Sequence, residues 1–123
     1  MEAVNYLRQA RKLEIMINQK ETELKRLKQD AVGRDGRRME ELVAKYIDME
    51  EKLNEDICDL HKRRIEIMDT IHKVDDSLCL VVLHAKWIDG ESLEQIAAKI
   101  GYSFPHIRRK YWKGMKEIKK IID

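Results

Sequence analysis

The chain has 123 residues, of which 39% are charged and 43% are hydrophobic, with a single proline and five glycines. This composition is typical of long, solvent-exposed helices and argues against a compact α/β domain. No apolar stretch is long enough for a membrane span, the first residues carry no signal-peptide pattern, and two cysteines do not make a disulfide framework. We therefore expect an all-α, cytoplasmic protein that has no membrane partner.

The net charge of +2 is distributed unevenly along the chain. Residues 1–76 contain 16 Lys and Arg against 18 Asp and Glu, whereas residues 77–123 contain 9 against 5. Residues 104–120 contain seven basic residues and one acid, Glu117. A basic C-terminal segment favours binding of a polyanion at one end of the molecule. The alternative is that these charges form an ordinary solvated helix face.

Residues 1–76 follow a helical pattern that is interrupted once. Apolar residues recur at helical spacing over residues 3–31 and again over about residues 37–73. The segment Gly33-Arg34-Asp35-Gly36 between them is a turn signal, so the pattern predicts a long antiparallel, coiled-coil-like hairpin. Because such a hairpin buries little area, we expect self-association through residues 1–70, with a dimer favoured over a monomer whose hairpin folds back on the C-terminal domain.

A buried helix is predicted at the start of a second domain, residues 77–123. Asp75-Asp76-Ser77 is a cap signal for this helix. The apolar residues that follow, from Leu78 to Trp87, fall on nearly all sides of a helix. We therefore expect this helix to lie at the centre of a small three-helix domain.

Two further helices and a tight turn are predicted after it. Ser92 and Gln95 form a capping box at the start of a short helix. Gly101 falls at its end, where the left-handed backbone conformation favours glycine. Ser103 is placed to cap the last helix, which we expect over about residues 104–122.

The spacing of Ala97, Gly101 and Ile107 is that of a DNA-binding helix-turn-helix. The small alanine lets the second helix cross closely, the glycine makes the turn, and the isoleucine fills the gap between the helices. The second helix then projects into the major groove of DNA. The residues that we predict to contact base edges are Phe104, His106, Arg108 and Arg109, and those that we predict to contact phosphates are Lys99, Ser103, Lys113 and Lys116.

Residues 78–120 resemble region four of the bacterial sigma factors, and resemble more closely the small sigma-like regulators of bacteriophages of Gram-positive hosts, the ArpU and RinA type. The resemblance implies a transcriptional regulator of phage or prophage origin in a bacterial host, with double-stranded DNA as ligand and host RNA polymerase as a candidate partner. Lys110, in a slot that is usually apolar, and Pro105 depart from the pattern. The resemblance is carried by Trp87, Asp89-Gly90, Ser92-Leu93, Ile96-Ala97, Gly101-Tyr102-Ser103, Ile107 and Gly114-Met115.

Two other functions remain open. A DNA-packaging component similar to the small terminase subunits of phages would also join a helix-turn-helix to a coiled hairpin, but it would assemble into a ring rather than a dimer. A helix-turn-helix adaptor that binds protein instead of DNA is favoured by Lys110 and Pro105, because both alter the helix that would enter the groove.

The sequence offers little for catalysis or metal binding. The pairs Cys58-x-x-His61 and Asp69-x-x-His72 have the i,i+3 spacing of half a metal site, but the first helix offers only scattered Glu residues as further ligands. No glycine-rich phosphate loop and no nucleophile–histidine arrangement with supporting context is present. We therefore predict a protein that is not an enzyme and has no metal and no cofactor.

Overall fold

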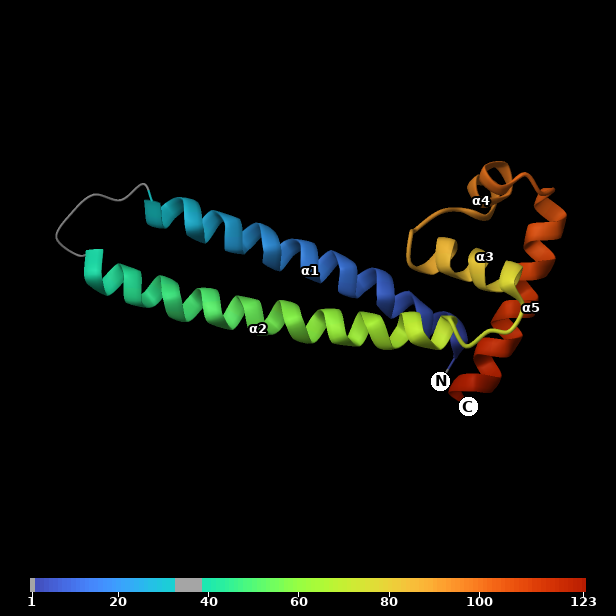
Figure 1. The fold of residues 1–123 in the computed structure, drawn as a ribbon, viewed down its shortest axis with the longest axis horizontal. Coiled ribbons are helices and arrows are strands. Elements are labelled where there is room, and N and C mark those ends of the chain that lie inside the picture. Colours follow the sequence, from blue (N-terminus) through green and yellow to red (C-terminus); the bar gives the residue numbers. More distant parts are fainter. Residues whose placement is uncertain (1, 33–38) are drawn as a thin grey trace. The chain divides into compact units, whose positions relative to one another are not determined.

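The computed structural model describes residues 2–32 and 39–123, and within these ranges the chain forms five helices and no strand (Figure 1). The all-α class is confirmed, and the helix ends lie within two residues of the predicted ones. The predicted turn at residues 33–36 lies outside the described residues. None of the helices described here is long and apolar enough to cross a membrane. The helices are α1 (Ala3–Val32), α2 (Met39–Ile71), α3 (Ser77–Trp87), α4 (Leu93–Ile100) and α5 (Phe104–Ile122).

The chain divides into two compact units. The first, here called the head unit, consists of residues 1–12 and 63–123, and the second, the arm unit, consists of residues 13–62. The head unit therefore includes α3, α4 and α5 together with the beginning of α1 and the end of α2. Leu7 of α1 and Ile71 of α2 are completely buried in it. The sequence pattern placed both segments in the hairpin, because periodicity along one helix does not show which neighbour covers its apolar face.

In the arm unit, α1 and α2 run antiparallel. Two ion pairs show this direction: Lys20 pairs with Asp56 (3.8 Å) and Lys28 pairs with Glu50 (3.6 Å). The later residue of α1 is thus paired with the earlier residue of α2. Lys20 is only partly exposed, and its pairing with Asp56 gives its charge a partner on the other helix. Ion pairs of this partly exposed kind contribute only about 0–1 kcal/mol each, so they set register more than stability.

In the head unit, α3 is fixed at both ends. The Asp76 carboxylate accepts hydrogen bonds from the backbone N–H groups of Leu78 (2.9 Å) and Cys79 (3.1 Å), which makes Asp76 the N-cap residue. Just beyond the other end, the Arg64 guanidinium donates a long hydrogen bond to the carbonyl of Ile88 (3.5 Å). Arg64 interrupts the apolar stripe of α2, and this contact gives the interruption a structural role.

The packing of α5 on α3 depends on Gly114. A Cβ atom at this position would lie 2.8 Å from Cδ1 of Leu83 and 3.4 Å from Cβ of Cys79. Leu83 and Cys79 are both fully buried, so neither has free space into which to move. Glycine therefore allows α5 to approach α3 more closely than any other residue would.

Candidate nucleic-acid interface

The turn between α4 and α5 is built by local hydrogen bonds. The hydroxyl of Ser92 accepts the N–H of Gln95 (3.2 Å), and the side-chain oxygen of Gln95 accepts the N–H of Ser92 (2.9 Å), so the predicted capping box is confirmed. The helix ends at Gly101, whose φ is +77° and whose N–H donates to the carbonyl of Ala97 (3.0 Å). The predicted glycine turn is thus confirmed as well, and only Tyr102 and Ser103 separate it from α5.

The first turn of α5 is held by two contacts. The hydroxyl of Ser103 accepts the backbone N–H of His106 (3.4 Å), which confirms Ser103 as the N-cap. The rings of Tyr102 and His106 stack, with centroids 5.1 Å apart and planes inclined by 18°. Pro105 lies in this first turn, where its missing N–H breaks no hydrogen bond of the helix. The start of α5 is therefore held in place by contacts within the protein.

The two faces of α5 differ sharply in burial. Ile107 is fully buried and Tyr111 is 7% exposed, so these residues fix α5 on the rest of the head unit. Phe104, in the first turn of the helix, is 37% exposed. His106 is half-buried, and its ring stacks on that of Tyr102. The predicted DNA-contacting residues that lie exposed on α5 are Phe104, Arg108, Arg109, Lys113 and Lys116.

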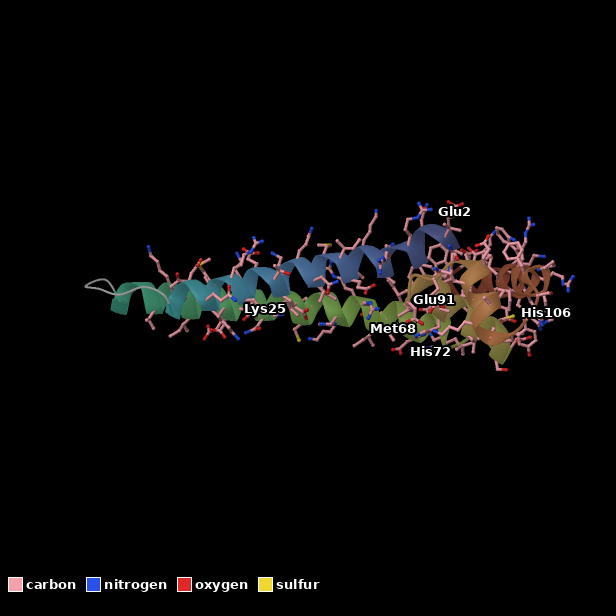
Figure 2. The ribbon with its side chains drawn as sticks, turned by 90° about the horizontal axis from the view of Figure 1, so that it is seen from above. Glu2, Lys25, Met68, His72, Glu91 and His106 are labelled. Carbon is pink, nitrogen blue, oxygen red and sulfur yellow. The ribbon has the colours of Figure 1, made fainter. Side chains whose placement is uncertain are left out.

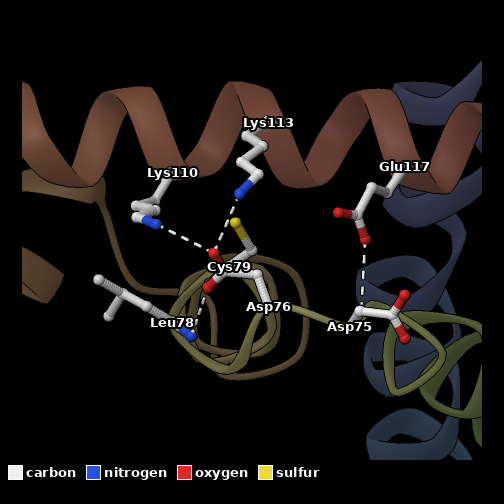
Figure 3. A network of polar contacts seen from close by, with 7 residues as sticks. All are labelled: Asp75, Asp76, Leu78, Cys79, Lys110, Lys113 and Glu117. Carbon is white, nitrogen blue, oxygen red and sulfur yellow. Dashed lines mark hydrogen bonds and ion pairs between the residues drawn. The ribbon is translucent and has the colours of Figure 1, made fainter.

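Asp76 connects α3 to two lysines of α5 (Figure 3). Its second carboxylate oxygen accepts from Nζ of Lys110 (3.0 Å) and from Nζ of Lys113 (3.2 Å). The bond from Lys110, the backbone N–H of Cys79 and the bond from Lys113 hold the pKa of Asp76 well below its ordinary range. The same contact raises the pKa of Lys113. Lys113, predicted to bind phosphate, therefore already has an anionic partner within the protein.

Lys99, the predicted phosphate ligand on α4, is paired as well. Its Nζ lies 3.0 Å from a carboxylate oxygen of Glu91, the residue before the capping serine. Glu91 is labelled among the side chains in Figure 2. The hydrogen bond to Glu91 raises the pKa of Lys99. Within the described parts of the chain, Arg108, Arg109 and Lys116 have no such ion pair. The predicted set thus separates into cations that are neutralised inside the protein and cations that are available to a ligand.

Trp112 is a surface residue of α5 to which the sequence pattern gave no role. It is 53% exposed, and its ring meets the ring of Tyr111 edge-on at a centroid distance of 5.1 Å. The available signal was its position four residues after Arg108, which places the two side chains next to each other on one helix face.

The possible metal ligands on α2 do not converge. Cys58 is exposed, and Nε2 of His61 lies 4.0 Å from a carboxylate oxygen of Glu21. His72 instead stacks on His84 of α3, with 3.3 Å between Nε2 of His72 and Nδ1 of His84. Among the residues that the structure describes, no three His, Cys, Asp or Glu side chains lie close enough together to hold a metal ion.

No protein-family model matches the sequence, and no similar chain was found among the curated proteins or among the solved structures. The function must therefore be inferred from the residues and the geometry of the chain itself.

Proposed function

We propose that the chain is a sequence-specific, double-stranded DNA-binding transcriptional regulator of phage or prophage origin. In this proposal α3, α4 and α5 form a trihelical helix-turn-helix domain, in which α5 is the recognition helix. The observation that carries the proposal is the outer face of α5, where Phe104, Arg108 and Arg109 are exposed directly after a tight, well-capped turn. Residues 104–116 contain no Asp or Glu, so no carboxylate in this stretch repels a phosphate.

The buried face of α5 supports the proposal because it holds the outer face rigidly. Ile107 and Tyr111 anchor the first turns, so the neighbouring arginines lose little conformational freedom when they bind. Arginine pairs bidentately with guanine, and the ring of Phe104 is suited to a thymine methyl group. Lys116, one helical turn beyond Trp112, is placed to neutralise a phosphate.

Self-association through the arm unit is the second part of the proposal. The antiparallel helices of this unit form the hairpin, and several large apolar residues on both helices are exposed by 44–50%. Contact with a second copy would remove this surface from water. The two head units of one dimer would then bind two half-sites of a DNA target, as paired helix-turn-helix domains do. The exposed residues are Ile15, Met16, Val43, Ile47 and Met49.

The pairing of Lys110 bears on the adaptor alternative. A charged residue in a slot that is usually apolar favoured an adaptor, because an unpaired lysine there would disturb the docking helix. Lys110 is instead bound to Asp76 and only partly exposed, so its charge is used within the head unit. This observation favours the DNA-binding function. Contact with host RNA polymerase remains part of the proposal through the sigma-like resemblance alone.

The test is binding of the purified chain to fluorescent duplexes, measured by anisotropy at several salt concentrations. The ligands are a random-sequence pool and fragments of the genome that encodes the chain. We expect one fragment to bind more tightly than the pool, with affinity that falls steeply as salt increases. The Arg108→Ala/Arg109→Ala variant should lose about tenfold or more of its affinity for that fragment and most of the preference.

The matched control is Lys25→Ala/Arg26→Ala, which removes the same charge from an exposed pair on α1. It should bind the preferred fragment almost as the unmodified chain does. If both double variants lose affinity equally, net charge rather than the α5 face determines binding, and the proposal is wrong. Sedimentation equilibrium of the same samples separates a regulatory dimer from the ring expected of a packaging component.

A further inference from the structure

Trp112 lies in the middle of the basic face of α5. It is 53% exposed, and its ring packs edge-on against the ring of Tyr111. Single exposed apolar residues are common on protein surfaces and by themselves need no explanation. The surroundings of this tryptophan are what give it significance.

The helical neighbours of Trp112 on the exposed side are all cations. Arg108 and Arg109 precede it by four and three residues, and Lys116 follows it by four, so all three lie beside its ring. The one acid of this helix, Glu117, has its carboxylate directed elsewhere, because it accepts the backbone N–H of Asp75 (3.3 Å; Figure 3). An aromatic ring surrounded by available cations complements a ligand that carries both anionic groups and apolar faces. The backbone of a nucleic acid has both.

The position of Trp112 along the helix indicates which part of a duplex it would meet. It follows Phe104 by eight residues, which corresponds to about 12 Å along an α-helix. In helix-turn-helix proteins the N-terminal residues of the recognition helix contact the base edges. If the first turn of α5 does so, a side chain this far along the helix lies beyond the base edges, beside the sugars and phosphates.

We propose that the Trp112 indole packs against the deoxyribose–phosphate backbone of the duplex that α5 enters. This inference rests on the proposed function and adds to it a contact that does not depend on DNA sequence. The ring covers a deoxyribose, and its N–H is available to a phosphate oxygen. Trp112 thus strengthens binding to every duplex, whereas Arg108 and Arg109 discriminate between them.

The first test is the affinity of Trp112→Ala for the preferred fragment and for the random pool. Both affinities should fall by the same factor, about tenfold at a fixed salt concentration. Because indole carries no charge, the slope of log affinity against log salt should stay the same, whereas Lys116→Ala, which removes a cation placed to neutralise a phosphate, should reduce that slope by about 1. Ile65→Ala, which truncates a residue of α2 that is 52% exposed, is the control and should bind normally.

The second test measures contact directly. The chain has two tryptophans, so a Trp87→Phe background leaves Trp112 as the only indole fluorophore. Acrylamide should quench Trp112 strongly in the free protein and much less in the duplex complex. If duplex binds, the double arginine variant loses its preference and yet Trp112→Ala binds normally with unchanged quenching, then this inference is wrong and the proposed function stands. If no duplex binds at low salt, both are wrong.

Discussion

The head unit and the arm unit are both helical, but they bury their side chains to very different extents. All of the largest fully buried side chains among the described residues belong to the head unit, including Leu83, Ile107 and Ile118. In the arm unit the most buried apolar residues retain 4–8% exposure, and several others are about half exposed. Both units expose some large apolar side chains, such as Ile65 and Trp112 in the head unit, but among the described residues only the head unit also has a fully buried core.

This difference separates two tasks. A surface that reads DNA must keep its side chains in fixed positions, and a complete core beneath α5 provides that rigidity. A surface that associates with a second copy must instead offer apolar area that a single chain does not use. Each unit has the property that its proposed task requires, and substitutions in the two units should therefore differ in their effects on stability and on self-association.

The largest expected effect comes from one pair of isoleucines. Ile107→Ala removes a fully buried side chain from the head unit and should lower the free energy of unfolding by about 2–5 kcal/mol. Ile47→Ala truncates a side chain of the arm unit that is 50% exposed. The free energy of unfolding of the monomer should therefore change by no more than about 0.5 kcal/mol. Urea unfolding followed by circular dichroism measures both values.

The same pair should behave oppositely in self-association. Ile47→Ala is expected to weaken the dimer, so its unfolding midpoint should depend less strongly on protein concentration than that of Ile107→Ala. Equal losses of unfolding free energy in the two variants, at a concentration where the chain is monomeric, would contradict the comparison.

A smaller effect is expected where α5 crosses α3. Gly114→Ala gains about 1 kcal/mol in helix propensity, but it places a methyl group 2.8 Å from Leu83, and overpacking in a core typically costs about 1–3 kcal/mol. The cost of overpacking should exceed the gain in helix propensity. The free energy of unfolding, measured with urea, should therefore fall by on the order of 1 kcal/mol. Ala98→Gly makes the reverse substitution at an exposed position of α4 and is the control. Because no core packing is involved there, its effect on stability should come from helix propensity alone. A Gly114→Ala variant that is more stable than the parent would show that Leu83 can move.

Local signals in the sequence were sufficient to predict the helices. The capping box at Ser92, the glycine turn at Gly101 and the N-cap at Ser103 each involve residues within four positions of one another. The assignment of the two ends of the long helices was not accessible in this way. Leu7 and Ile71 follow the same periodicity as the residues of the arm unit, and only the tertiary structure places them in the head unit.

The candidate site was predictable in its position but not in its electrostatics. The exposed face of α5 follows from helical spacing, as expected for Arg108 and Arg109. The ion pairs that engage Lys110 and Lys113 do not, because their partner Asp76 lies more than 30 residues earlier and on another helix. Charge patterns along a sequence identify cations, whereas only the fold shows which of them are already neutralised.

The smallest expected effect concerns that neutralisation and its dependence on pH. The folded state holds the pKa of Asp76 below its ordinary value of 3.8, so the ionised carboxylate stabilises the fold above that value. This contribution is lost as the pH falls from about 5 towards the lowered pKa. Asp76→Asn retains a good N-cap residue but loses both lysine contacts. Its urea midpoint should therefore lie below that of the parent at pH 7, and the difference should shrink at pH 3.

Asp69→Asn is the matched control, since Asp69 is an exposed carboxylate of α2 in the same unit. Its midpoint should follow the parent at both pH values.

Release of Lys110 and Lys113 should also raise the affinity of Asp76→Asn for random duplex and steepen its salt dependence, because two more cations become available to phosphates. Loss of stability together with a gain in DNA affinity would show that the head unit uses these lysines for its own fold at the expense of binding. An unchanged salt slope would mean that the two lysines lie away from the bound DNA, and the interface would then be limited to the outer face formed by Arg108, Arg109, Trp112 and Lys116.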